Sequence, residues 1–107
     1  MIHPKLTTIL TELSEALRER LGVRFRGLWL YGSQARGDAG PESDIDLLLV
    51  LADPQRPALE IDRIVDILAD FNLRYGVLLS VLPVAEPWLQ EGSGPFWRQV
   101  RAEGVAA

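Results

Sequence analysis

The amino-acid sequence predicts an α+β fold in which three strands are flanked by helices. Apolar residues recur at helical spacing near the start of the chain and again in its middle. Three short apolar runs have the composition of strands, and segments rich in glycine and proline separate these elements. The length of 107 residues suits one domain, so we expect residues 1–107 to form a single domain.

The helices are predicted from apolar periodicity and from the glycines that follow it. The first spans residues 4–21 and ends at Gly22. A turn at residues 53–57 leads into a long helix that runs to about residue 75, and the tail from residue 86 holds two short helical segments around a break at 92–95. The expected buried face of the long helix consists of Ile61, Ile64, Val65, Leu68 and Phe71.

An acidic row, Asp62, Asp66 and Asp70, recurs every four residues along the long helix. It resembles a metal cluster, but we favour a solvent-exposed face in which Arg74 supports Asp70 four residues away.

The three strands are predicted at residues 25–31, 44–51 and 77–84. The second contains a run, residues 47–51, that is apolar on both faces, so we expect this strand to be central in the sheet.

Composition excludes several classes of protein. The chain has no cysteine, so neither a disulfide nor a thiolate zinc site can form. No apolar run approaches the roughly 20 residues of a membrane span, and the first residues lack the features of a signal peptide, so we expect a cytoplasmic protein. The net charge of −4 argues against an extended nucleic-acid surface.

The segment from residue 28 to residue 51 carries the chemistry. Gly32 and Ser33 end one predicted strand, and Asp44 and Asp46 open the next. Side chains alternate along a strand, so the two carboxylates share a face, with Cα atoms roughly 6–7 Å apart. A bound Mg²⁺ relieves their repulsion and accepts substrate phosphates as further ligands, while a Gly-Ser turn offers N–H groups and a hydroxyl to phosphate. Together these features indicate nucleotide chemistry.

Other known motifs do not account for this segment. Gly-Ser or Asp-x-Asp alone would be ordinary turn and cap chemistry. Gly32 and Gly37 have the spacing of a Walker A loop, but Asp38 stands where lysine is required. An EF-hand loop would need glycine at Leu49, and no nucleophile elbow surrounds Ser33.

The pattern Gly32-Ser33, ten intervening residues and Asp44-Ile45-Asp46 resembles the signature of the polymerase-beta-like nucleotidyltransferase superfamily. The string GSQARGDAGPESDIDLLLV is similar to its minimal nucleotidyltransferase (MNT) branch, whose members often act as the antitoxin of a helical HEPN toxin. The resemblance implies a mixed three-stranded sheet flanked by helices. It also implies transfer of a nucleoside monophosphate, for which we expect AMP from ATP, to a protein partner, with Mg²⁺ or Mn²⁺ as cofactor.

The resemblance also implies roles for individual residues. Gly32 and Ser33 would bind the triphosphate, and Asp44 and Asp46 would be the catalytic metal ligands. Arg36 would contact phosphate, since a guanidinium suits that task. An equally weighted alternative is that Arg36 forms a salt bridge to an acidic residue of the following loop, Asp38 or Glu42.

The sequence departs from the superfamily at one position. The superfamily usually has a third carboxylate on the following strand, and Ser80 stands at the matching place. A second interpretation is therefore a module that binds nucleotide or caps a partner with little or no catalysis. The large apolar side chains Trp88, Phe96 and Trp97 could anchor such a partner, although core packing is slightly favoured for Trp97.

Overall fold

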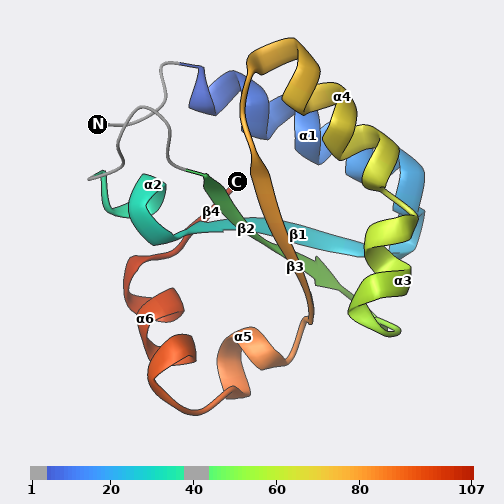
Figure 1. Cartoon of the computed structure of the whole chain (residues 1–107). Helices are drawn as coiled ribbons and strands as arrows, with labels where there is room; N and C mark the ends of the chain where they lie inside the picture. The colour runs from blue at the N-terminus through green and yellow to red at the C-terminus, as the bar shows by residue number, and fades with distance from the viewer. Residues whose placement is uncertain (1–4, 38–43) are drawn as a thin grey trace.

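A mixed four-stranded sheet with helices on both faces forms the structure (Figure 1), a computed structural model that describes residues 5–37 and 44–107. The strands are β1 (Phe25–Tyr31), β2 (Ile45–Leu51), β3 (Leu79–Ala85) and β4 (Val105–Ala106), in the order β3-β2-β1-β4. Strand β2 runs parallel to β3 and antiparallel to β1. The predicted α+β class and the inner position of β2 are confirmed.

The fourth strand was not predicted. It contains only two residues, and it pairs antiparallel with β1 through Trp29 with Ala106 and Leu30 with Val105. Two residues are too few for a recognisable strand pattern, so the predicted three-stranded sheet gains this short edge strand only through the tertiary fold.

The helices are α1 (Leu6–Leu21), α2 (Gly32–Arg36), α3 (Pro57–Asp62), α4 (Val65–Tyr75), α5 (Trp88–Glu91) and α6 (Pro95–Glu103), and a short 3₁₀ turn, η1 (Gly22–Arg24), follows α1. The two short helices predicted for the tail correspond to α5 and α6. The beginning of the predicted first helix, at residue 4, lies outside the described residues.

The predicted long helix is broken into α3 and α4. Ile64 has non-helical backbone angles, φ −127° and ψ 1°, and its N–H donates to the carbonyl of Ile61 at 3.0 Å instead of continuing the α-helical ladder. The break lets the Ile64 side chain become fully buried. It also turns Val65 outward, so that this residue is 52% exposed and its predicted place on the buried face is wrong.

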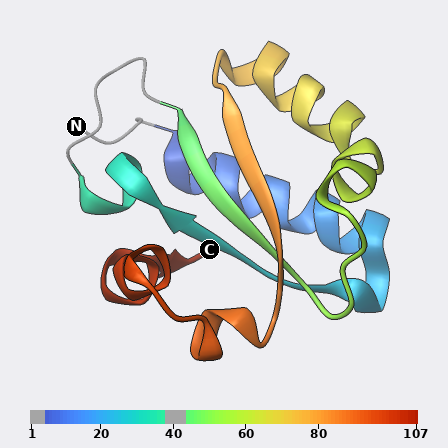
Figure 2. The same cartoon turned by 60° about the horizontal axis from the view of Figure 1, so that its bottom comes forward.

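Helices cover both faces of the sheet (Figures 1 and 2). Each face carries a hydrophobic core. Residues Ile45, Leu47, Leu49 and Leu51 of β2 belong to the larger core, which includes residues of α1 and α4. Leu48 and Val50 point to the other face, where they pack with Val84 of β3 and Val100 of α6. By the same alternation, Asp46 belongs to the face with the smaller core.

The acidic row on α3 and α4 is solvent-exposed, as favoured from the sequence, and two of its three carboxylates form ion pairs. Asp70 pairs with Arg74 at 3.0 Å. Asp66 pairs instead with Arg20 of α1 through two contacts of 2.8 and 2.9 Å, and the hydrogen bond from Arg20 lowers the pKa of Asp66 to about 2. Over residues 5–37 and 44–107, the structure contains no group of three or more histidine, cysteine, aspartate or glutamate side chains suited to a metal ion.

Glu60 is a buried carboxylate that joins α3 to η1. Its side chain is 1% exposed and is contacted by the guanidinium of Arg24, by Arg63 at 3.0 Å and by the N–H of Gln55 at 2.8 Å. Burial favours the neutral acid, but the hydrogen bonds from Arg24 and Gln55 outweigh this effect and lower the pKa of Glu60. The Arg24–Glu60 ion pair joins α3 to the residue that precedes β1, at the end of this strand opposite the candidate site.

Among the described residues, no helix has both the length and the apolar character needed to cross a membrane.

Candidate active site

The site begins where β1 ends beside the start of β2. Antiparallel pairing places Asp46 opposite Tyr31, the last residue of β1, and Gly32 follows directly. A Cβ atom added to Gly32 would lie 2.5 Å from Oδ2 of Asp46, and Gly32 has φ +75°, which disfavours other residues. Glycine is therefore required here for the Gly-Ser turn to approach the carboxylate.

Asp44 and Asp46 flank a buried residue. Asp44 is exposed and immediately precedes β2, whereas Asp46 is half-buried as the second residue of that strand. Ile45 between them is fully buried in the larger core. Since Ile45 points into that core, strand alternation directs the two carboxylates to the opposite face, with Cα atoms roughly 6–7 Å apart.

The backbone of Ser33 and Arg36 belongs to α2. Their side chains are not among the parts that the structure describes, and neither are residues 38–43, which include the proposed partners Asp38 and Glu42. The phosphate-binding roles of Ser33 and Arg36 remain predictions from the resemblance.

Ser80 lies directly beside Asp46. In the parallel pairing of β2 with β3, Asp46 and Ser80 are register partners, so both side chains project from the same face. Ser80 is exposed, and β3 carries no acidic residue. This pairing agrees with the match of Ser80 to the place of the third carboxylate.

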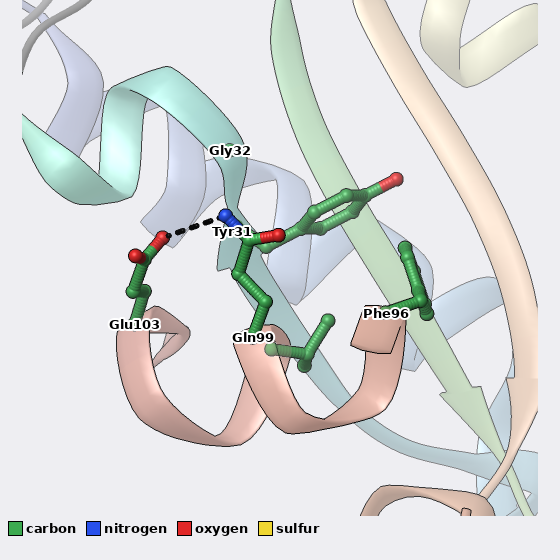
Figure 3. Close-up of a pocket in the computed structure, with 6 residues that line it drawn as sticks. Tyr31, Gly32, Phe96, Gln99 and Glu103 are labelled. Atoms are coloured by element: carbon green, nitrogen blue, oxygen red, sulfur yellow. Dashed lines mark hydrogen bonds between the residues drawn. The ribbon is translucent and has the colours of Figure 1, made fainter. Parts of the chain in front are cut away.

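A small cavity adjoins this corner between β1 and α6 (Figure 3). It has a volume of about 170 Å³ and is lined by Tyr31, Gly32, Phe96, Gln99, Val100 and Glu103. Gln99 and Glu103 were not predicted as site residues, because no motif joins them to Gly32, which lies more than sixty residues earlier in the sequence.

The aromatic side chains at this corner form a continuous row. The rings of Tyr31 and Phe96 meet edge to face with centroids 5.7 Å apart, and Phe96 meets Trp97 at 5.2 Å. Burial, followed by the nearby charge of Asp46, raises the pKa of the Tyr31 hydroxyl. Trp97 packs against the smaller core, whereas Phe96 is 42% exposed and Trp88 is 50% exposed.

The mixed sheet, the glycine turn and the neighbouring carboxylates agree with the fold and site that the nucleotidyltransferase resemblance implies. The family model for the nucleotidyltransferase domain matches residues 10–85. The chain belongs to this family, and the expected resemblance is confirmed.

Three relatives from Methanocaldococcus jannaschii are provisionally named protein adenylyltransferases. One is 32% identical over 94 residues, which span 87% of this chain and 88% of the relative. The second is 31% identical over 78% of this chain and 58% of its own length. The third is 31% identical over 71% of this chain and 76% of its own length. These relatives support the expectation that this chain is an enzyme of the nucleotidyltransferase class.

Two solved structures share the fold. A provisionally assigned nucleotidyltransferase from Sulfolobus solfataricus matches with a TM-score of 0.67 at 16% identity, over 95% of this chain and 78% of that one. A chain of a toxin–antitoxin complex with AMP-PNP matches with a TM-score of 0.59 at 20% identity, over 92% and 69% of the two chains.

Proposed function

We propose that this protein transfers AMP from ATP to a protein partner in the cytoplasm, with Mg²⁺ or Mn²⁺ as cofactor. The observation that carries the proposal is the close approach of Gly32 to Asp46, which joins the predicted phosphate-binding turn to a carboxylate of the predicted metal pair. The names of the relatives, protein adenylyltransferase, support both the nucleotide and the class of acceptor.

The donor set suits a hard divalent cation. Asp44 and Asp46 supply only oxygen ligands, and two carboxylates leave coordination positions for substrate phosphates, as is typical of Mg²⁺. When bound, the metal would neutralise the charge of the phosphates and stabilise the charge that develops during transfer. The backbone of Gly32 and Ser33 would hold the triphosphate beside it.

In the proposed reaction, a hydroxyl oxygen of the partner forms a bond to the α-phosphorus of ATP. The bond from this phosphorus to the bridging oxygen of the β-phosphate breaks, and pyrophosphate leaves. The hydroxyl proton must pass to a base, and Ser80 cannot serve because its hydroxyl lacks a suitable pKa. The base would therefore come from the partner or from solvent.

A second candidate function is supported by the same serine. Without a third carboxylate beside Asp46, the protein would bind Mg²⁺–ATP and cap its partner while transferring AMP slowly or not at all. The exposed Trp88 and Phe96 suit a protein interface under either function. We propose a helical HEPN-type toxin as that partner, because the MNT resemblance implies it and a chain of a toxin–antitoxin complex shares the fold.

The test combines the protein, Mg²⁺, ATP labelled at the α-phosphate and the purified product of the neighbouring gene. Label on that product supports AMP transfer, while ATP binding without label transfer supports the capping function. Absence of ATP binding would overturn both. Size-exclusion chromatography of the co-expressed pair measures the complex, and separate elution at micromolar concentration would contradict a stable partnership.

A further inference from the structure

We infer that the cavity between β1 and α6 receives the nucleobase of the substrate, an inference that rests on the proposed function. Glu103, together with Gln99, then selects a base that presents an amino group. Adenine is such a base, because its exocyclic amine donates hydrogen bonds.

The position of the cavity fits one end of a nucleotide. Gly32 belongs both to the cavity wall and to the turn that would hold the triphosphate, so a ligand can occupy the two places at once. Pockets for whole drug-sized ligands have volumes of about 300–1,000 Å³. The cavity, with about 170 Å³, therefore suits one part of the nucleotide rather than all of it.

The charge of the residues that line the cavity indicates which part of the nucleotide enters it. The described residues that line it include the carboxylate of Glu103 and no lysine or arginine. Away from the metal that Asp44 and Asp46 would hold, a carboxylate disfavours the negatively charged triphosphate but can accept a hydrogen bond from an uncharged base. The nucleotide would thus lie with its phosphates towards Asp46 and its base against α6.

The hydrogen-bonding groups of the cavity are mainly acceptors (Figure 3). Nε2 of Gln99 donates to Oε2 of Glu103 at 3.4 Å, so the amide nitrogen is turned towards the carboxylate and its oxygen away from it. A carboxylate accepts several hydrogen bonds at once, and an amide oxygen accepts two. This pair therefore recognises a donor, such as the exocyclic amine of adenine.

The aromatic residues supply the remaining recognition. Tyr31 and Phe96 line the same cavity from β1 and α6, and their rings are fixed by the edge-to-face contact described above. Aromatic side chains are common platforms for nucleobases because every base has a π-face. Ribose hydroxyls also donate hydrogen bonds, but they lack the flat apolar faces that these rings suit.

Isothermal titration calorimetry of the full chain with Mg²⁺ tests the inference with three nucleotides. They are ATP, purine riboside triphosphate, which lacks only the amine, and 2′-deoxyATP. The native protein should bind ATP about 10-fold or more tightly than the analogue without the amine, since hydrogen bonds to charged groups contribute this much. Glu103→Ala should abolish the difference, so that these two nucleotides bind alike.

The matched control is Glu91→Ala, which removes an exposed carboxylate of α5 outside the cavity and should leave the preference unchanged. Gln99→Ala, at an exposed position, should reduce the preference several-fold, with Gln90→Ala as its control. This second pair decides the question if thermal unfolding shows that Glu103→Ala does not fold.

The outcomes separate this inference from the proposed function. Equal affinity of the native protein for ATP and the analogue without the amine would overturn base selection while leaving nucleotide binding intact. If Glu103→Ala removes discrimination against 2′-deoxyATP instead, the cavity holds ribose and the inference is wrong. If the native protein binds none of the three nucleotides, the proposed function itself fails.

Discussion

The backbone of Gly32 and the carboxylate of Asp46 are in such close contact that a Cβ atom at Gly32 would stand 2.5 Å from Oδ2. The obstructing atom is the end of a side chain, so Gly32→Ala should displace the carboxylate and weaken Mg²⁺-dependent ATP binding by at least about 10-fold, equivalent to ~1.4 kcal/mol. Calorimetric titration measures this affinity.

The control is Gly37→Ala. Gly37 has φ +79°, close to that of Gly32, but a Cβ there would meet no atom within 4 Å. Both variants should lose about 1–2 kcal/mol of stability from backbone strain, and only Gly32→Ala should lose affinity. Equal losses of affinity would show that backbone strain, not contact with the carboxylate, is responsible.

Removal of either predicted metal ligand should also weaken binding. Asp44→Asn and Asp46→Asn should each sharply reduce the affinity for ATP in the presence of Mg²⁺, because each removes one negative ligand. The fold should persist, since neutralising one of two neighbouring carboxylates relieves repulsion. Titration with and without EDTA measures the effect, and Asp53→Asn, an exposed carboxylate beyond the other end of β2, is the control. Unchanged affinity in both variants would contradict the assignment.

Ser80→Asp should create a third carboxylate on the face of Asp46, because these two residues are register partners. The rate of AMP transfer should rise by about 10²-fold or more, which is the low end for general base catalysis. Affinity for ATP should stay nearly the same, since Asp44 and Asp46 remain. A rate that falls would mean that the mechanism does not require a carboxylate at this position. Single-turnover transfer with labelled ATP gives the rate.

Glu60→Gln should destabilise the protein at neutral pH. The variant leaves the half-buried Arg24 without its charged partner, which costs about 3 kcal/mol at the lower end for buried ion pairs. The folded-state pKa of Glu60 lies below its ordinary value of 4.5. The ionised side chain therefore stabilises the folded protein above pH 4.5, and this stabilisation is lost as the pH falls through the lowered pKa.

Urea denaturation of the native protein and Glu60→Gln at pH 7 and pH 3 checks this prediction. The difference in free energy of unfolding should shrink at pH 3. A matched control is Asp62→Asn, an exposed acidic residue of the same helix, for which we expect little change at either pH. A difference for Glu60→Gln that is independent of pH would assign its role to packing rather than to charge.

The sequence predicts those elements whose own residues define them. Strand β1 has the predicted bounds because its apolar run stands between a helix end and the Gly-Ser turn. The break at Ile64 was missed, because neither glycine nor proline marks it and the burial of one side chain causes it. The Arg20–Asp66 ion pair depends on the packing of α1 against α4, which local sequence does not specify.

For the site, the sequence suggests the residues that lie within one short motif. Gly32 and Asp46 could be proposed together because one follows the end of a predicted strand and the other lies at the start of the next. The approach of Glu103 to Gly32 requires the return of α6 and β4 to β1, a long-range contact that leaves no periodic signal in the sequence.

The two faces of β2 contribute differently to folding and to the candidate site. Its odd-numbered residues, from Ile45 to Leu51, belong to the larger core, while Asp46 shares the opposite face with the thinner layer of α5 and α6. Substitutions in that thinner layer can alter recognition with little loss of the apolar burial that keeps the chain folded. We therefore expect substitutions at exposed residues of α6 to change the ligand or partner of this domain while the larger core stays intact.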